Sequence, residues 1–318
     1  MKTLSIYSLN CLLMLLLVAC EDFEDFVVDN DFTAVYFASQ RPLRTILADD
    51  EMTFKVGVAL AGKRANNVEE FATFEIDPAL LEDSALVGNR NFTLLPAEYY
   101  TLSNNSMMII PPGRFIGDIT VTLNQDAFVN DELATANTYA LPLRIIDTSA
   151  DSVLSGQFDS SGSVQIAPKD YTVLVVKYIS PLHGFYYHKG LEQELDINDQ
   201  VVSEEVYNDR DLVKNQVWTF TTLGLDSVTT SGVGTLISSG TNIYNLKLAV
   251  NADNSVTIGG VEGNNVTGIQ GSGTYRLAEN TFYLNYRYIN AGTTFNVIDT
   301  LIQRQSPELD LRFEEWVP

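Results

Sequence analysis

The chain has 318 residues, of which 41 are acidic and 19 basic, so its formal net charge at neutral pH is −22. This charge argues against nucleic acid as a partner, because binding to phosphate backbones depends on clustered Lys and Arg side chains. The length exceeds what one hydrophobic core usually supports, which predicts two domains.

The first twenty residues have the pattern of a bacterial lipoprotein signal. Lys2 precedes a leucine-rich stretch from Cys11 to Val18, and Ala19 and Cys20 follow directly. The apolar run is too short to cross a bilayer of about 30 Å, and a small residue before a cysteine suits a lipoprotein signal peptidase. We therefore expect removal of residues 1–19 and lipidation of Cys20, for example with palmitate. The alternative is an ordinary secretory peptide that contains a cysteine.

The processed chain would have no cysteine for a disulfide, because Cys11 leaves with the signal and Cys20 carries lipid. Loss of Lys2 changes the net charge from −22 to −23. Residues 20–30 are expected to form a solvated acidic tether, since four of residues 21–25 are Asp or Glu. This segment resembles the acidic export signal of Bacteroidetes surface lipoproteins, which implies an outer-membrane location facing the cell exterior.

Residues 31–180 show the period-two hydrophobic alternation of β-strands. Phe54, Val56, Val58 and Leu60, for example, alternate with Lys55, Gly57 and Ala59. Strands are predicted at 33–38, 54–60, 71–76, 106–110, 119–123, 139–146 and 171–179, with one short helix at 78–86. Short strands at this spacing, separated by Gly, Pro, Asn and Asp, favour an immunoglobulin-like β-sandwich.

A domain boundary is expected at Ser180-Pro181, where proline ends the preceding strand. Residues 181–318 contain predicted strands at 184–189, 217–223, 242–250, 255–258, 273–277, 281–289 and 293–303. Asn280 and residues 290–292 supply turns for a meander whose inner face would be Phe282, Leu284, Tyr286 and Tyr288. An up-and-down order without a covering helix favours an antiparallel, lipocalin-like barrel. A second sandwich is the alternative, and either way the chain is all-β.

The first block contains four characteristic segments, 95–102 (LPAEYYTL), 108–113 (MIIPPG), 121–123 (VTL) and 139–145 (YALPLRI). With these segments it resembles an N-terminal, immunoglobulin-like domain of unknown function in surface lipoproteins that Bacteroidetes encode in polysaccharide-utilisation loci. In the second block, residues 177–179, 183–186, 273–275 and 282–286 look like the C-terminal partner domain of such proteins. Neither family carries a catalytic motif, so the resemblance implies location and role.

The residues themselves indicate no catalytic or metal site. The only two histidines, His183 and His188, have no Cys or carboxylate at ligand spacing nearby. Hydrolase elbows, zinc-protease motifs and phosphate loops are missing from the sequence. Residues 29–31 and 196–199 offer oxygen ligands for calcium, but without EF-hand spacing. We therefore expect no metal, no cofactor and no enzymatic activity.

Aromatic residues of the second block are the candidates for ligand binding. Sugars present apolar faces that pack on Tyr and Trp rings, while polar side chains bind the hydroxyls. Tyr207 and Trp316 are expected to be exposed, since Tyr207 lies in a polar segment and Trp316 near the terminus. The predicted glycan-binding residues are Tyr186, Tyr207, Trp218, Tyr283, Arg287 and Trp316.

Together these features predict a non-catalytic, lipid-anchored surface protein that binds glycans for a polysaccharide-uptake system. Its expected partners are the membrane, through the lipid on Cys20, a polysaccharide or oligosaccharide, and an outer-membrane transporter complex. The alternative is a structural or adhesive protein, such as a fimbria-like subunit or a transporter scaffold. A glycosidase would need two carboxylates facing each other across a cleft, which sequence cannot show.

Overall fold

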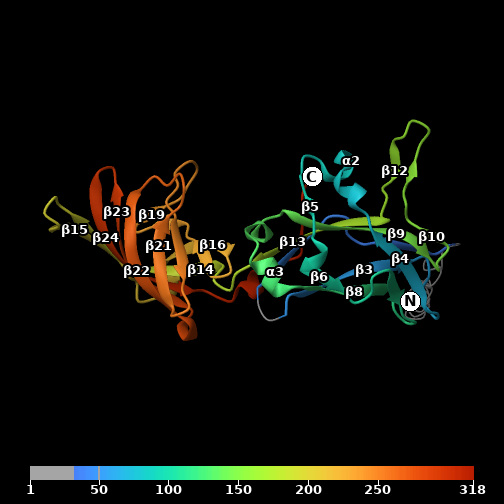
Figure 1. The fold of residues 1–318 in the computed structure, drawn as a ribbon, viewed down its shortest axis with the longest axis horizontal. Helices are drawn as coiled ribbons and strands as arrows, with labels where there is room; N and C mark the ends of the chain where they lie inside the picture. Colours follow the sequence, from blue (N-terminus) through green and yellow to red (C-terminus); the bar gives the residue numbers. More distant parts are fainter. Residues whose placement is uncertain (1–31, 49–50) are drawn as a thin grey trace, which may run out of the picture.

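The computed structural model describes residues 32–48 and 51–318, which form a sandwich and a barrel placed end to end (Figure 1). The predicted signal peptide, Cys20, the tether and residues 29–31 lie outside the described residues. Within the described ranges, no helix is long and apolar enough to cross a membrane. The prediction of an all-β chain is confirmed.

The sandwich consists of two main sheets. One has the order β10-β1-β3-β8-β6, and the other β25-β2-β13-β9-β4-β7, with β5 added beside β9. The strand bounds are β1 (Ala34–Phe37), β2 (Pro42–Leu47), β3 (Thr53–Ala61), β4 (Glu70–Ile76), β5 (Thr93–Leu94), β6 (Tyr100–Leu102), β7 (Met107–Ile110), β8 (Ile116–Leu123), β9 (Tyr139–Thr148), β10 (Ser152–Val153), β13 (Tyr171–Ile179) and β25 (Glu314–Glu315). A separate hairpin, β11 (Gln157–Phe158) and β12 (Val164–Ile166), projects from the sandwich (Figure 1).

Short helical turns connect these strands, namely η2 (Pro78–Leu81), α2 (Ser84–Val87), η3 (Ala97–Tyr99), α3 (Gln125–Val129) and η4 (Glu132–Thr135). The expected helix at 78–86 is thus two successive turns, η2 and α2. Asp77 and Asp83 cap them by accepting the backbone N–H of Ala79 and Ala85. A new cap at Asp83 separates the turns, which is why no continuous helix forms.

Strand β13 is buried on both faces and connects the two apolar clusters of the sandwich. Leu174, Val176 and Tyr178 face the core between the sheets, whereas Tyr171, Val173 and Val175 face a second cluster on the outer side. A strand covered on both faces has a continuous hydrophobic sequence. The second cluster therefore needs a cover from elsewhere in the chain.

The C-terminal domain is a closed eight-stranded antiparallel barrel, so the alternative of a second sandwich is wrong. Its strands are β14 (Gly184–Leu195), β16 (Gln216–Gly224), β17 (Ser227–Thr229), β20 (Leu246–Val250), β21 (Ser255–Gly260), β22 (Thr267–Arg276), β23 (Thr281–Asn290) and β24 (Thr293–Gln303). Pairing of β14 with β24 closes the ring. The predicted inner face of β23, from Phe282 to Tyr288, is buried as expected.

Shorter elements accompany the barrel, namely β15 (Val201–Tyr207), η5 (Leu212–Lys214), β18 (Gly232–Val233), β19 (Leu236–Ile237) and η6 (Leu277–Glu279). The turns predicted before and after β23 contain Asn280 and Ala291, which have φ values of 47° and 48°. Asn accepts this left-handed conformation more readily than most residues.

The last fifteen residues leave the barrel and return to the sandwich, through η7 (Pro307–Asp310) to β25. Strand β25 pairs with β2, and Trp316 is only 4% exposed. Its indole Nε1 donates to the carbonyl oxygen of Val173 at 2.7 Å, and its ring meets Phe92 edge-on at 4.9 Å. The range 181–318 predicted for the second domain therefore differs from the structure at its end. The expected exposure of Trp316 is wrong, because this ring covers the outer cluster of β13.

The joint between the domains is held by hydrogen bonds. The backbone N–H of Ser180 donates to Oγ1 of Thr222 at 3.0 Å, and the N–H of Thr222 donates to Nδ1 of His183 at 3.2 Å. Gln303 Nε2 donates to the carbonyl oxygen of Pro181 at 3.1 Å. With the returning segment, two stretches of chain thus cross between the domains.

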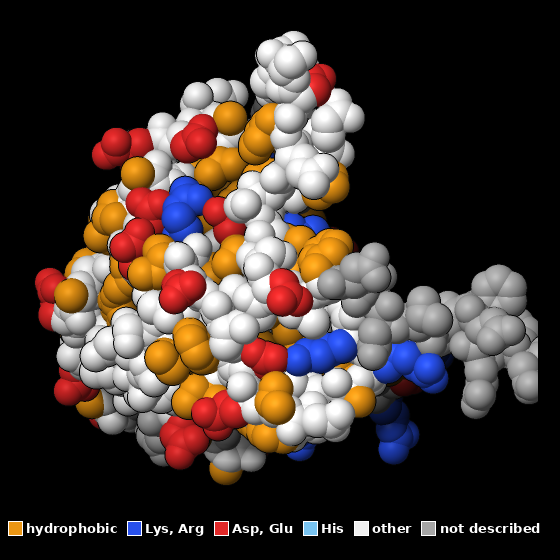
Figure 2. All heavy atoms as spheres, turned by 90° about the vertical axis from the view of Figure 1, so that its right-hand side faces the viewer, with side chains coloured by type: hydrophobic (Ala, Val, Ile, Leu, Met, Phe, Trp, Pro, Cys, Tyr) orange, Lys and Arg blue, Asp and Glu red, His pale blue; other side chains and the backbone are white. Residues whose placement is uncertain are grey.

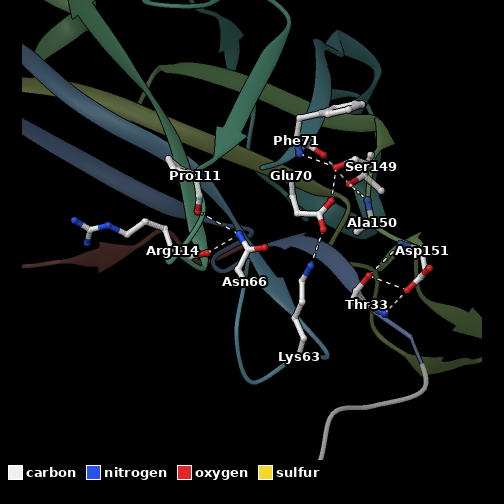
Figure 3. Close-up of polar contacts among 11 residues, drawn as sticks. Thr33, Lys63, Asn66, Glu70, Phe71, Pro111, Arg114, Ser149, Ala150 and Asp151 are labelled. Atoms are coloured by element: carbon white, nitrogen blue, oxygen red, sulfur yellow. Dashed lines mark hydrogen bonds and ion pairs between the residues drawn. The ribbon is translucent and has the colours of Figure 1, made fainter. Parts of the chain in front are cut away.

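The far end of the sandwich, where the described chain begins, is closed by polar contacts (Figure 3). The N–H and hydroxyl of Thr33 both donate to Oδ2 of Asp151, at 2.7 and 2.8 Å. Glu70 accepts from Lys63 and from Ser149, each at 2.6 Å, and these bonds lower the pKa of Glu70. Figure 2 looks onto this end and shows acidic, basic and apolar side chains interspersed. The chain therefore enters the sandwich opposite the barrel (Figure 1).

Replacement of Trp316 should destabilise the sandwich selectively. Trp316→Ala removes a buried ring and its hydrogen bond, so we expect a loss of about 3–5 kcal/mol in the free energy of unfolding of this domain. Hydrogen exchange followed by mass spectrometry should show faster exchange in β2 and β13 and unchanged exchange in β22 and β23. Phe313→Ala is the matched control, because Phe313 is 64% exposed. Equal effects of the two substitutions would contradict the covering role of Trp316.

The joint should weaken below neutral pH through His183. Burial, with a smaller effect of Lys177, lowers the pKa of His183 below its ordinary value of 6.5, because the folded joint favours the neutral ring. The unfolded chain then binds more protons than the folded chain, so stability is complete above about pH 6.5 and falls as pH decreases through the lowered pKa. Urea midpoints between pH 7 and 5 should show this slope, and His183→Gln should reduce it. A wild-type midpoint that rises on acidification would refute the prediction.

Candidate functional site

A buried polar network occupies one end of the barrel interior. Asp299, on β24, is 1% exposed. Its Oδ1 accepts from Nε2 of His188 at 2.9 Å and from the hydroxyl of Tyr207 at 2.7 Å. Its Oδ2 accepts from the hydroxyl of Tyr286 at 2.7 Å. Three donors thus compensate the cost of burying this carboxylate.

A second carboxylate, Glu192 on β14, extends the network towards the end of the barrel. Its Oε2 accepts from the hydroxyl of Tyr288 at 2.8 Å, and both the N–H and the hydroxyl of Thr235 donate to Glu192, at 3.1 and 2.9 Å. The N–H of Gly234 donates to the hydroxyl oxygen of Tyr286 at 2.8 Å, which joins the two halves. Every one of these side chains therefore has a partner within the chain.

Burial, followed by the nearby carboxylates, raises the pKa of three tyrosines in the network. Asp299 acts on Tyr207 and Tyr286, and Glu192 acts on Tyr288. A phenol with a raised pKa keeps its proton, so each tyrosine remains a hydrogen-bond donor to its carboxylate.

Two glycines make room for this network. Gly190 lies opposite both Asp299 and Tyr207 in the sheet, and a Cβ atom there would lie 2.6 Å from Oδ1 of Asp299. Gly234 has a φ of +55°, and a Cβ atom there would lie 1.8 Å from Oε2 of Glu192. Larger residues at either position would push the carboxylates away from their donors.

Beyond the network, the hairpin of β14 and β15 extends past the barrel (Figure 1) and forms one side of a pocket of about 250 Å³. We call this pocket the barrel mouth. The ring of Phe295 is half-buried and stacks on Tyr288 at 5.0 Å, with an interplanar angle of 13°. The barrel mouth is lined by Glu192, Glu194, Ser203, Glu205, Thr235, Leu236, Tyr288, Asn290 and Phe295. It combines an aromatic surface with carboxylate and amide groups.

The six predicted glycan-binding residues do not form one site. Tyr186 and Trp218 are fully buried in the barrel core, so they cannot be exposed platforms. Tyr283 and Arg287 lie on the outer face of β23, where Tyr283 donates to Glu279 at 2.7 Å and Arg287 pairs with Asp199 at 3.2 Å.

Trp316 lies in the sandwich, and Tyr207 is the single predicted residue that belongs to the polar network. The residues that sequence reasoning missed are Glu192, Tyr288, Asn290, Phe295 and Asp299. The predicted strand at 184–189 is too short, because β14 runs to Leu195. A strand of that length places Glu192 on the same inward face as His188, so the full strand would have revealed Glu192.

The described residues, 32–48 and 51–318, contain no group of three or more His, Cys, Asp or Glu side chains placed to hold a metal ion. In the proposed calcium segment 196–199, Oδ1 of Asp196 instead accepts the backbone N–H of Asn198 and Gln200, each at 2.8 Å. This carboxylate therefore stabilises the turn between β14 and β15.

Comparison with known proteins finds a family model for the first domain and a solved structure with a similar fold across both domains. Residues 29–152 match a family model described as an N-terminal domain. A crystal structure of a Bacteroides ovatus protein of unknown function matches with a TM-score of 0.71 and 24% sequence identity, over 87% of this chain and 95% of that chain. No curated protein sequence matches this chain.

Two further structures from Bacteroides ovatus are less similar. One, of unknown function, has a TM-score of 0.45 and 12% identity over 90% of this chain and 100% of that chain. The other, a candidate carbohydrate-binding protein, has a TM-score of 0.32 and 16% identity over 71% of this chain and 67% of that chain. Neither similarity supports an argument about fold or function. The family match and the first structure confirm the predicted resemblance to Bacteroidetes proteins built from β-rich domains.

Proposed function

We propose that this chain is a non-catalytic, lipid-anchored protein of the outer-membrane surface that binds glycans at the barrel mouth for a polysaccharide-uptake system. The observation that carries this proposal is the half-buried Phe295 ring, stacked on Tyr288 and surrounded by hydrogen-bonding side chains. A sugar ring would pack its apolar face on Phe295. Glu194, Glu205 and Asn290 would accept or donate hydrogen bonds at its hydroxyls.

The two buried carboxylates support binding rather than hydrolysis. A glycosidase needs one carboxylic acid that can protonate the glycosidic oxygen and a second carboxylate facing it across the sugar. Asp299 and Glu192 are each occupied by three donors of the chain itself. We infer that these groups stabilise the barrel and hold Tyr288 beneath Phe295.

The path of the chain supports display of the barrel away from the membrane. The first described strand begins at the end of the sandwich opposite the barrel (Figure 1). A lipid on Cys20 would therefore attach the sandwich end to the bilayer, with about 0.8 kcal/mol of membrane affinity for each buried methylene. In this arrangement the sandwich acts as a spacer.

Substitution of Phe295 tests the binding site. Isothermal titration of the processed protein against a panel of soluble plant, host and microbial polysaccharides should identify a ligand. Phe295→Ala should weaken its binding roughly 5- to 30-fold, because about 1–2 kcal/mol of ring packing is lost. Tyr283→Ala is the matched control, because this half-buried tyrosine lies on the outer face of the barrel. Equal affinities of the wild type and Phe295→Ala for the glycan would exclude the barrel mouth as its binding site. No binding across the panel would favour the structural or transporter-scaffold role.

Substitution of Asp299 tests the structural role of the network. Asp299→Asn replaces one of the two accepting oxygens by an N–H₂ group, which then faces hydrogen-bond donors and cannot accept from them. We therefore expect a loss of about 2–4 kcal/mol in the free energy of unfolding of the barrel. Trp218 fluorescence should report it, because this indole stacks on His188 at 3.9 Å. Glu204→Gln, on the exposed strand β15, should change stability little. Release of reducing sugar by the wild type, abolished in a stably folded Asp299→Asn variant, would instead identify an enzyme.

A further inference from the structure

The barrel wall is interrupted beside His188. Strands β15 and β16 both pair with the same edge of β14, so that Tyr207 lies opposite Gly190 and Gln216 lies opposite His188. The two strands continue one another along this edge, and residues 208–215 between them form a loop that does not pair with β14. We call these eight residues the wall loop, because they lie in the barrel wall where a paired strand would otherwise be.

The wall loop has a fixed conformation. Asn215 is 8% exposed, and its Oδ1 accepts the N–H of Asp209 at 2.9 Å. Its Nδ2 lies 3.0–3.2 Å from the carbonyl oxygens of Asp209, Asp211 and Leu212. The buried side-chain amide of Asn215 thus holds the backbone of the loop in place. A ligand that binds beside the loop would therefore lose little affinity to ordering of the loop.

A pocket of about 400 Å³ lies between the wall loop and β14. We call it the wall pocket. It is lined by His188, Val206, Tyr207, Asn208, Asp209, Lys214, Asn215 and Gln216. Val206 is the one aliphatic residue of this lining, and the others carry hydrogen-bonding groups.

His188 is a buried member of this lining, and its ring is 2% exposed. Trp218 stacks on the ring at 3.9 Å, and Tyr207 lies 4.6 Å from it. Because the Asp299 carboxylate can only accept, Nε2 carries a proton, and in the tautomer protonated at Nε2 the other nitrogen, Nδ1, is an acceptor. Among the residues that the structure describes, Nδ1 has no hydrogen-bond partner.

We propose that the wall pocket is a second ligand site, distinct from the barrel mouth, which binds one uncharged sugar ring through a hydroxyl that donates to Nδ1 of His188. A buried acceptor without a donor is unfavourable, and a ligand hydroxyl would supply the missing hydrogen bond. Asn208 and Gln216, at the rim, would bind further hydroxyls. The pocket volume is sufficient for one six-membered ring.

Charge limits the class of ligand. Lys214 is paired with Asp211 at 3.8 Å, so its charge is already offset. Asp209 lies at the rim, and the Asp299 carboxylate bonds to the His188 ring itself, so the charge next to the proposed hydroxyl site is negative. An anionic sugar such as a uronate would therefore be repelled, whereas a neutral sugar would be accepted.

The test uses the processed protein and long-range ¹⁵N NMR of its two histidines. The probes are the methyl glycosides of glucose, galactose, mannose and N-acetylglucosamine, with glucuronate as the anionic counterpart. At least one neutral glycoside should shift the Nδ1 signal of His188, because a new hydrogen bond forms there. His183 is the internal reference, since its Nδ1 already accepts from Thr222.

Two rim variants keep the test independent of folding, because Asn208 and Gln216 are exposed. Asn208→Ala and Gln216→Ala should each weaken the binding that the His188 signal reports three- to tenfold, while Tyr283→Ala, on the outer face of the barrel, should leave it unchanged. Failure of all neutral probes to move the His188 signal would mean that the pocket holds only water, which would overturn the proposal. Equal binding of glucuronate would overturn the charge selection. Neither result would affect polysaccharide binding at the barrel mouth.

Discussion

The structure depends on the pairing of β14 with β24, which is continuous from Tyr186–Gln303 to Leu195–Thr294. This ladder closes the barrel, and it leaves no free strand edge where the first and last strands meet. The same strand begins at the domain joint, carries His188 and Glu192 on its inner face, and supports β15 at its other edge. Loss of this one ladder would open the core, expose both carboxylates and separate the barrel mouth from the wall pocket.

The interior of the barrel is divided into an apolar end and a polar end. One end is filled by aromatic and aliphatic side chains such as Phe220, Phe282 and Leu284, and the other end holds Asp299 and Glu192 with their donors. Buried carboxylates are tolerated only when their hydrogen bonds are complete. At the polar end, few substitutions of the residues that donate these bonds are therefore compatible with a stable fold. The apolar end tolerates replacements of similar volume more readily. Ligand-binding surfaces are proposed only at the polar end, where this stricter constraint applies.

Local sequence patterns were sufficient to predict the all-β class, the sandwich and barrel, and the buried face of β23. These features follow from the alternation of residues two apart and from turn chemistry at positions such as Asn280. The candidate site was not predictable in this way. Asp299 and His188 are 111 residues apart and meet because the barrel closes, which no local pattern encodes. Trp316 was misplaced for the same reason, since its cover of Val173 depends on a return across the domain joint.

Because residues 304–318 return to the sandwich, part of the sandwich can be completed only after the barrel has been synthesised. In the chain, the barrel is an insertion between β13 and β25, two strands of the same sheet. During synthesis the sandwich strands up to β13 are made first, yet the outer cluster at Val173 and Val175 stays uncovered until the segment after the barrel brings Trp316. Bringing Trp316 to β13 closes a loop that contains the whole barrel, and this entropic cost is smaller once the barrel is compact. A segment made after the barrel therefore completes the domain that was begun before it.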